Sequence, residues 1–249
     1  MKMTDSAFFH DYTVDYSDVD EKKTLRPSHL LDFLQSLAVM HSDYIGFDLD
    51  YFEQNHQVWM LINYHITIER WPAEGEILKI STWSDKYGRV RANRNFAVAD
   101  EEGREICYAA SRWVLVDLDK RRPAKPKPDF IEPYTFPNCR EIPEESFEMP
   151  EMPAREPDWC QEMKVTRRDM DTNGHTNNAR YMDWASDTIP DEIYLKKTLR
   201  DIRITYKKEC TRGMKIKIRT WQEGDTLISL FTDADDDSYV VGEIATIWT

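Results

Sequence analysis

The chain has 249 residues, enough for one large domain or for two domains of about 120 residues. It is 41% hydrophobic and contains eight Trp and twelve Tyr, so it can build a substantial core, and its eight Gly and twelve Pro exclude low-complexity classes. A formal net charge of −13 argues against general nucleic-acid binding and against adhesion to anionic membranes.

The cysteines and the N-terminus favour a reducing compartment. The cysteines show neither a close pair nor the spacing of a zinc site, which is typical of free thiols. No apolar run approaches the roughly 20 residues of a transmembrane helix, and residues 1–10 resemble neither a signal peptide nor a transit peptide. We expect a cytoplasmic protein with no membrane span, no metal and no cofactor.

The first half predicts a strand, a long helix and four more strands. Residues 8–18 alternate as a strand does, and Ser28 can cap a helix that Gly46 would end in a left-handed conformation. His41 lies on the apolar face of this helix, so we expect it to be packed and hydrogen-bonded rather than catalytic. The further strands are predicted at 58–71, 76–85, 90–100 and 106–118.

A proline-rich segment separates the two halves. Residues 121–158 contain nine prolines, which predicts an extended linker or crossover on the surface. The pattern then resumes with a helix to about residue 189 and strands at 201–209, 214–223, 226–233 and 239–248. We therefore divide the chain into an N-terminal domain, a linker and a C-terminal domain, at 1–125, 126–160 and 161–249.

The two halves repeat one another. Three residues of the first half recur 138 positions later, and a Thr precedes each Trp: Ile66, Gly75 and Trp83 match Ile204, Gly213 and Trp221. Each half also has a helix before its main strands. The repeat indicates an internal duplication. A helix followed by four long antiparallel strands suits a sheet wrapped around one central helix.

A polar segment at residues 166–184 passes through a Gly and turns into a helix with an apolar face. Thr176 or Asn177 can cap that helix. In an extended chain, residues two apart point the same way, so Asp171, Asn173 and His175 would line one side beside the free N–H groups of the helix. That places an acid or base, a polarising amide and an anion site together.

A plainer interpretation competes with this one. Asp and Asn ahead of a helix are common caps and turn formers, and a single His is often structural. Six polar residues around one Gly are harder to explain by capping alone: Asp171, Thr172, Asn173, His175, Asn177 and Asn178.

Two motifs carry a resemblance to a known family. The run from Arg167 to Tyr181 reads Arg-Arg-x-x-Asp-x-Asn-x-His-x-Asn-Asn-x-x-Tyr, and Tyr206 to Cys210 reads Tyr-x-x-Glu-Cys. Together they resemble the signature of the acyl-acyl carrier protein thioesterases, known best from plant plastids. Weaker similarity extends from about residue 11 to residue 249.

The resemblance implies an α+β fold of two tandem hotdog units, in which each antiparallel sheet wraps around a central helix. It implies hydrolysis of a fatty acyl thioester in fatty acid biosynthesis, with acylated carrier protein as substrate and partner. Plant members carry a transit peptide, so its absence favours a bacterial-type cytoplasmic enzyme or a shortened sequence. Trp71-Pro72 occupies in the first half the place of Glu209-Cys210, so we expect the first half to bind the acyl chain and the second half to react.

Two chemical schemes fit these residues. In one, Cys210 is the nucleophile, His175 its base and Asn173 the orienting group. In the other, which we prefer, Asp171 or Glu209 activates water or attacks directly, while His175 and Asn173 orient and polarise. A Cys at a strand end is often only a small apolar residue.

The carrier protein is acidic, so its docking would need a basic face. Residues 86–127 provide one, and the candidate docking residues are Arg89, Arg91, Arg121 and Arg122. Positive side chains on a strand edge can instead discourage aggregation. A hotdog hydratase or dehydratase, an acyl-coenzyme A thioesterase and a non-catalytic acyl-binding protein are the alternatives. Chain length preference and association into a homodimer stay open.

Overall fold

The computed structural model describes residues 2–136, 138–139, 144–172 and 174–249. The chain forms two compact units. Unit 1 comprises residues 1–25 and 32–146, and unit 2 comprises residues 26–31 and 147–249. In the described part of the chain, no helix has the length and apolar character needed to cross a membrane.

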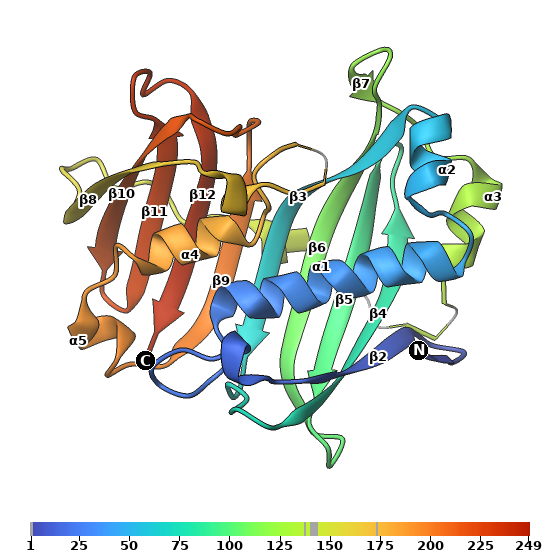
Figure 1. Cartoon of the computed structure of the whole chain (residues 1–249), viewed down its shortest axis with the longest axis horizontal. Helices are drawn as coiled ribbons and strands as arrows, with labels where there is room; N and C mark the ends of the chain where they lie inside the picture. Colours follow the sequence, from blue (N-terminus) through green and yellow to red (C-terminus); the bar gives the residue numbers. More distant parts are fainter. Residues whose placement is uncertain (1, 137, 140–143, 173) are drawn as a thin grey trace. The chain divides into compact units, whose positions relative to one another are not determined.

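Unit 1 is an antiparallel sheet in the order β1-β2-β4-β5-β6-β3, with β7 on β6. Figure 1 shows the long helix α1 crossing one face of these strands. The predicted strands of the first half are confirmed within a few residues. The strands are β1 (Lys2–Met3), β2 (Phe8–Thr13), β3 (Gln57–Ile68), β4 (Ile77–Tyr87), β5 (Arg91–Ala99), β6 (Glu105–Asp117) and β7 (Arg122–Pro123).

The helix α1 (Pro27–Tyr44) packs its buried stripe against the sheet, where His41 contacts Phe8 of β2 and Arg94 of β5. Leu34, Leu37 and His41 are each fully buried, at the spacing of one helix face. Burial of each leucine contributes about 1.5–3 kcal/mol. A short helix α2 (Leu49–Gln54) follows, and its Asp48 cap accepts the Tyr51 N–H at 2.8 Å.

The first predicted strand ends earlier than expected. β2 stops at Thr13, and Tyr16–Asp18 form a 3₁₀ turn instead. The Asp18 carboxylate accepts the Asp15 N–H at 2.9 Å, which closes this turn and diverts the chain from the sheet.

The prediction that the proline-rich segment is extended and superficial is wrong for residues 128–136. Residues 128–136 form α3 (Pro128–Ile131) and a 3₁₀ turn at Glu132–Tyr134. Phe130 and Tyr134 are buried in an aromatic cluster of unit 1 with Leu115. Their burial explains the folding, because aromatic side chains provide large apolar areas. A second 3₁₀ turn lies at Glu144–Phe147.

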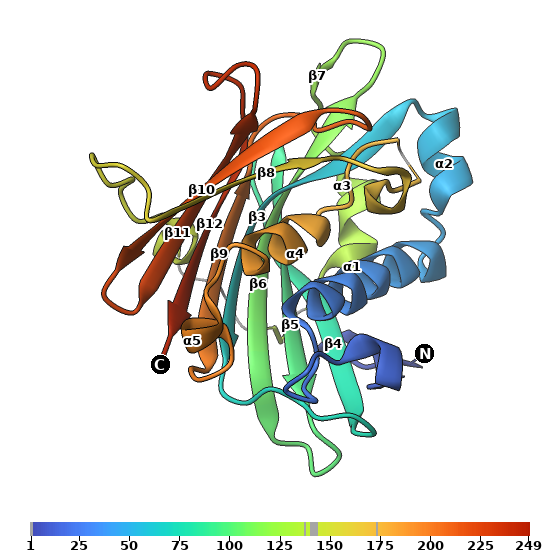
Figure 2. The same cartoon turned by 60° about the vertical axis from the view of Figure 1, so that its left-hand side comes forward.

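In its described residues, unit 2 contains five antiparallel strands, in the order β9-β12-β11-β10-β8. Figure 2 shows β8 beside β10. Tyr181 on α4 packs against Tyr206 of β9 and Phe231 of β11, so this helix covers the sheet. The elements are β8 (Trp159–Lys164), a 3₁₀ turn (Arg167–Asp169), α4 (Arg180–Ser186), α5 (Asp191–Tyr194), β9 (Leu199–Tyr206), β10 (Lys215–Glu223), β11 (Thr226–Asp233) and β12 (Val240–Trp248).

The units share local structure as well as sequence. Gly75 and Gly213 both have positive φ, +87° and +96°, and both open a strand. The Gly75 N–H donates to Val14 O at 2.8 Å, and the Gly213 N–H donates to Val165 O at 3.0 Å. Trp83 and Trp221 then occupy the matching strands β4 and β10. These paired features support the internal duplication.

Candidate active site

The polar segment of unit 2 folds as a tight loop between β8 and α4. Met170 and Thr176 form an isolated antiparallel bridge, and the Asp171 N–H donates to His175 O at 2.8 Å. Gly174 has φ +77°, which strains any residue with a side chain. The chain turns back here, so the prediction that Asp171 and His175 lie along an extended strand is wrong. Asn173 lies outside the described residues.

The start of the helix also differs from the prediction. α4 begins at Arg180 and its N-cap is Ala179, without a side-chain cap. Thr176 instead donates its hydroxyl to Cys210 O at 3.0 Å, and Asn177 Oδ1 accepts the Ala179 N–H at 2.9 Å. His175 therefore lies five positions before the helix.

Asp171 closes the loop with its side chain as well as its backbone. Its Oδ1 accepts the His175 N–H at 3.1 Å, and the residue is half-buried. This contact is the turn-forming role that Asp commonly plays. It also fixes the carboxylate at the base of the loop that carries His175.

Thr176 anchors the loop to the end of β9, where the Tyr-x-x-Glu-Cys motif lies. Its backbone N–H donates to Cys210 O at 2.9 Å, in addition to the hydroxyl contact. This brings His175 Nε2 to 3.9 Å from Glu209 Oε1. Both side chains keep about half their surface, 43% for His175 and 54% for Glu209, so a substrate can reach them. The structure thus brings together two residues that the sequence singled out separately.

A tyrosine that the sequence did not single out holds Glu209. The Tyr239 hydroxyl donates to Glu209 O at 3.0 Å, and the Lys208 ammonium lies 4.4 Å from the centre of the Tyr239 ring. Tyr239 lies 30 residues after Glu209, beyond β10 and β11, so no local pattern connects them. A long-range contact of this kind follows only from the sheet topology.

Cys210 is buried beside these groups, with 2% of its surface exposed. Burial raises the pKa of its thiol, although hydrogen bonds with Thr176 and Tyr181 act in the opposite direction. Desolvation likewise raises the pKa of Tyr181. A thiol that stays protonated is a poor nucleophile, so this environment favours a packing role over a catalytic one.

The candidate docking residues lie in unit 1, and all four are exposed: Arg89, Arg91, Arg121 and Arg122. Arg89 and Arg122 line one hollow of about 540 Å³, together with Lys120 and Lys125. Asp117 at its edge pairs with Lys120 at 2.6 Å. Arg91 and Arg121 are not among the residues that line this hollow. In the described part of the chain, no group of three His, Cys, Asp or Glu could hold a metal.

Family comparison covers both units. Residues 5–134 match the model of the acyl-ACP thioesterase N-terminal domain, and residues 154–249 match that of the acyl-ACP thioesterase C-terminal domain. The chain belongs to the acyl-ACP thioesterase family. The resemblance inferred from the two motifs is thereby confirmed.

Plant proteins are among the curated relatives of this acyl-ACP thioesterase family member. The oleoyl-acyl carrier protein thioesterase of Coriandrum sativum is 28% identical over 245 residues, which cover 92% of this chain and 63% of the relative. Oleoyl-acyl carrier protein thioesterase 1 of Arabidopsis thaliana is 29% identical over 209 residues, 78% of this chain and 58% of the relative. The chain thus spans about three fifths of the length of these relatives.

Solved structures confirm the fold of this family member. The acyl-ACP thioesterase from Bacteroides thetaiotaomicron has a TM-score of 0.83 at 24% identity, covering 99% of this chain and 100% of the other. The 12:0-ACP thioesterase from Umbellularia californica has a TM-score of 0.87 at 22% identity, covering 98% and 97%. The predicted α+β tandem of two hotdog folds is therefore confirmed.

Proposed function

We propose that this chain hydrolyses the thioester of fatty acyl-acyl carrier protein and releases a free fatty acid. The observation that carries the proposal is the accessible pair of His175 and Glu209, whose side chains lie 3.9 Å apart. Both residues fall in the part of the chain that matches the C-terminal domain of a family named for this activity. The four cysteines are free, which supports a reducing compartment such as the cytoplasm.

The pair can carry out the chemistry with water as the nucleophile. Glu209 takes a proton from water as the water oxygen attacks the thioester carbon, and His175 orients the reacting groups. The tetrahedral intermediate collapses by breaking the C–S bond, which yields a carboxylic acid and a thiol. A thiolate is a good leaving group, so the acid that protonates it need not be strong.

Asp171 and Asn173 complete the proposed set. Asp171 fixes the His175 backbone through its 3.1 Å contact and adds a negative charge at the base of the loop. Asn173 has the amide expected of a polarising group. We assign Cys210 to packing, because burial keeps its thiol protonated. The scheme with a Cys210 nucleophile stays the alternative, because hydrogen bonds with Thr176 and Tyr181 act against that effect of burial on the thiol.

Release of free thiol from a panel of acyl thioesters tests this function. We expect hydrolysis of acyl-carrier protein substrates at some chain length, and slower hydrolysis of the coenzyme A esters. Faster turnover of coenzyme A esters would identify an acyl-coenzyme A thioesterase. A hydratase or dehydratase would release no thiol and would change the acyl double bond, whereas tight acyl binding without turnover would identify a binding protein.

We propose that the basic hollow of unit 1 docks the acidic carrier protein. Arg89, Lys120, Arg122 and Lys125 converge on this hollow, while the chain as a whole is acidic. A local positive patch on a negative protein steers an acidic partner and raises its association rate. We further propose that unit 1 binds the acyl chain and unit 2 performs the reaction.

Paired charge reversal tests the docking proposal. Arg89→Glu with Arg122→Glu should raise the KM for acyl-carrier protein at least about tenfold and leave a small acyl thioester unaffected. Added salt should reproduce the effect on the unmodified enzyme. The matched control is Lys196→Glu, an exposed lysine of unit 2. Equal losses on both substrates would reject docking at this hollow.

A further inference from the structure

A row of polar side chains crosses the sheet of unit 1 beneath α1. Tyr64 pairs with Ser111, Ser111 with Arg94, and Arg94 with Ser84, so the four residues lie side by side on strands β3, β6, β5 and β4. Cross-strand partners point to the same face of a sheet. All four are buried, and Arg94 keeps 8% of its surface exposed. We call these four residues the polar row.

His41 of α1 joins this row from above. Its Nδ1 lies 3.1 Å from Arg94 Nη1. Because a guanidinium only donates, His41 Nδ1 must accept, and the ring proton of the neutral imidazole lies on Nε2. Burial and the neighbouring Arg94 lower the pKa of His41 to about 3, which agrees with a neutral ring.

The cluster contains more donors than acceptors. His41 Nε2 and Tyr64 Oη are buried without a hydrogen-bond partner among the described residues. Among the described residues, Arg94 Nη1 lies within hydrogen-bond distance of His41 and Thr82, and the guanidinium carbon lies 5.3 Å from the centre of the Tyr134 ring. No described carboxylate neutralises the guanidinium. A buried charge without a counter-charge and a buried donor without an acceptor both destabilise a fold. Natural cores avoid such groups unless they serve another purpose.

The fold itself does not require these polar groups, as the matching row of unit 2 shows. There Ile202 pairs with Thr246, and Thr246 with Leu227. Thr246 occupies in unit 2 the position of Ser111 in unit 1. In each unit the Trp two residues later donates its indole N–H to this hydroxyl, Trp248 to Thr246 Oγ1 at 2.9 Å and Trp113 to Ser111 Oγ at 2.8 Å. Ile202 and Leu227 thus stand where unit 1 has Tyr64 and Arg94.

We propose that the polar row and His41 bind an acceptor oxygen, with a carboxylate as the best fit, on an acyl chain held in unit 1. The substrates would then include acyl groups that carry a hydroxyl or a second carboxylate away from the thioester. A carboxylate supplies the missing counter-charge for Arg94 and accepts from His41 Nε2 or Tyr64 Oη. This inference rests on the proposed binding of the acyl chain by unit 1.

A surface hollow adjoins the cluster. It has a volume of about 450 Å³, and Phe136 is among its lining residues. The same Phe136 ring packs against His41, with 5.7 Å between ring centres. Phe136 thus contacts both the hollow and His41.

Ligand binding measured by calorimetry tests the inference without any turnover. The probes are saturated fatty acids of increasing length, each with its ω-hydroxy acid and its α,ω-dicarboxylic acid. At one length we expect the dicarboxylic acid to bind at least about tenfold tighter than the plain acid, with the hydroxy acid between them. Equal or weaker binding of the oxygenated acids at every length would overturn the inference.

Variants locate the effect. Arg94→Met should abolish the gain in affinity and leave the melting temperature of the free protein unchanged or raised, because it removes an unneutralised buried charge. Should that variant not fold, Tyr64→Phe removes one hydroxyl only and should reduce the gain. Tyr108→Phe is the matched control, since its hydroxyl already donates to Asn95 at 2.9 Å. A gain that persists in both Arg94→Met and Tyr64→Phe would reject the site.

The outcomes separate this inference from the proposed function. Normal thiol release and binding of plain fatty acids, without any oxygenated preference, would reject the polar-row site and leave the thioesterase standing. Absence of thiol release from all substrates would reject the thioesterase, while the binding series would still decide whether the polar row holds an acceptor.

Discussion

The same loop occurs in both units, and only the copy in unit 2 carries the proposed catalytic residues. In unit 1, Val19 and Leu25 form the bridge that Met170 and Thr176 form in unit 2. The Asp20 N–H donates to Thr24 O at 3.0 Å, as the Asp171 N–H donates to His175 O at 2.8 Å. These backbone contacts of the candidate active site are therefore common to both units.

The anchoring of the loop is repeated too. The Leu25 N–H donates to Pro72 O at 2.8 Å, and the Thr176 N–H donates to Cys210 O at 2.9 Å. The left-handed position is Lys23 in unit 1, with φ +59°, and Gly174 in unit 2, with φ +77°. Unit 1 thus accepts a strained residue where unit 2 has the residue that suits the conformation.

The side chains are what differ. The positions of His175, Glu209 and Cys210 correspond in unit 1 to Thr24, Trp71 and Pro72, and that of Asn173 to Lys22. Only the carboxylate of Asp171 has a counterpart, in Asp20. The comparison teaches that Asp at this position serves the turn in both units, and that the imidazole and Glu209 define the site of unit 2.

Among the changes that test this difference between the units, substitution of Glu209 should lower turnover most. Glu209→Gln keeps the size and polarity of the side chain and removes the base, so we expect turnover to fall by about 10²–10⁴. The melting temperature should stay near normal because the Glu209 side chain is exposed and the Tyr239 hydroxyl bonds to the Glu209 backbone oxygen, which the substitution keeps. Thiol release under saturating acyl-carrier protein is the measurement. Near-normal turnover would show that Glu209 is not the general base and would leave Asp171 as the candidate.

Asp171 and Asp20 occupy corresponding positions in the two units. The same substitution at both tests whether the charge of Asp171 or its role in the turn matters for turnover. Asp171→Asn keeps an oxygen for the His175 N–H, and we expect turnover to fall roughly 10²-fold with little change in melting temperature. Asp20→Asn makes the same change in unit 1, where Asp20 Oδ1 accepts the Lys22 N–H at 2.9 Å, and should leave turnover unchanged. Equal behaviour of the two variants would show that Asp171 is only a turn former.

The buried His41 should make unit 1 sensitive to acid. Burial lowers the pKa of His41 to about 3 in the folded protein. Between the ordinary histidine pKa and pH 3, His41 is therefore protonated in the unfolded chain and neutral in the folded chain. This depressed pKa means that stability is fully present above the usual pKa and is lost as the pH falls. The loss from this residue is about 2 kcal/mol by pH 5. His41→Gln should flatten the pH dependence of urea unfolding, and an unchanged slope would contradict this account.

Substitution of Cys210 should have a smaller effect on turnover. Cys210→Ser keeps a small polar group that can bond to Thr176 and Tyr181, so we expect turnover within about tenfold of normal. The thiol scheme predicts instead a loss of roughly three orders of magnitude in a folded variant. Single-turnover thiol release distinguishes the two mechanisms.

Much of the fold was predictable because the strands are long and periodic. Ile66 and Ile204, Gly75 and Gly213, and Trp83 and Trp221 identified the duplication, because matched turns and strands need the same residues. The folding of residues 128–136 was missed because Pro128 and Pro133 dominate the local pattern, while Phe130 and Tyr134 find their partners elsewhere in unit 1.

The candidate site was predictable in its residues more than in its geometry. His175 and Glu209 were named from their motifs, and their proximity depends on the anchor from Thr176 to Cys210 O, a contact across 34 residues. A hairpin-like loop was mistaken for an extended segment because Gly174 can adopt many conformations. The contact of Tyr239 with Glu209 depends on the sheet order and gives no local signal.

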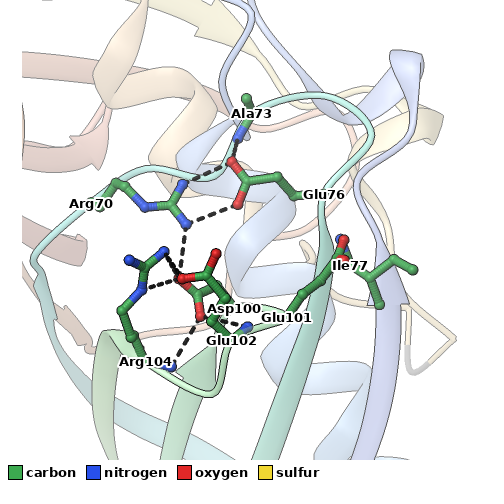
Figure 3. Close-up of polar contacts among 8 residues, drawn as sticks. All are labelled: Arg70, Ala73, Glu76, Ile77, Asp100, Glu101, Glu102 and Arg104. Atoms are coloured by element: carbon green, nitrogen blue, oxygen red, sulfur yellow. Dashed lines mark hydrogen bonds and ion pairs between the residues drawn. The ribbon is translucent and has the colours of Figure 1, made fainter.

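The smallest effect that we expect is the loss of stability on breaking the ion pairs that follow β3 in unit 1. Figure 3 shows Arg70 between Glu76 and Asp100, with Arg104 on the other side of Asp100. Arg70 donates twice to Glu76, at 2.7 and 2.9 Å, and Glu76 also accepts the Ala73 N–H at 2.8 Å. The network fastens two turns of unit 1, in the region that corresponds to Lys208 and Glu209 of unit 2.

Arg70→Met should therefore lower stability slightly and leave catalysis intact. The Arg70 side chain is 42% exposed, and screened pairs of this kind contribute under about 1 kcal/mol. Hydrogen bonding to Arg70 lowers the pKa of Glu76, so this contribution is present above the usual carboxylate pKa and disappears as the pH falls. Urea unfolding at neutral and acidic pH should show a difference between Arg70→Met and the unmodified protein only at neutral pH. A change in turnover of Arg70→Met would mean that this region of unit 1 also communicates with the reaction, and the division between the two units would fail.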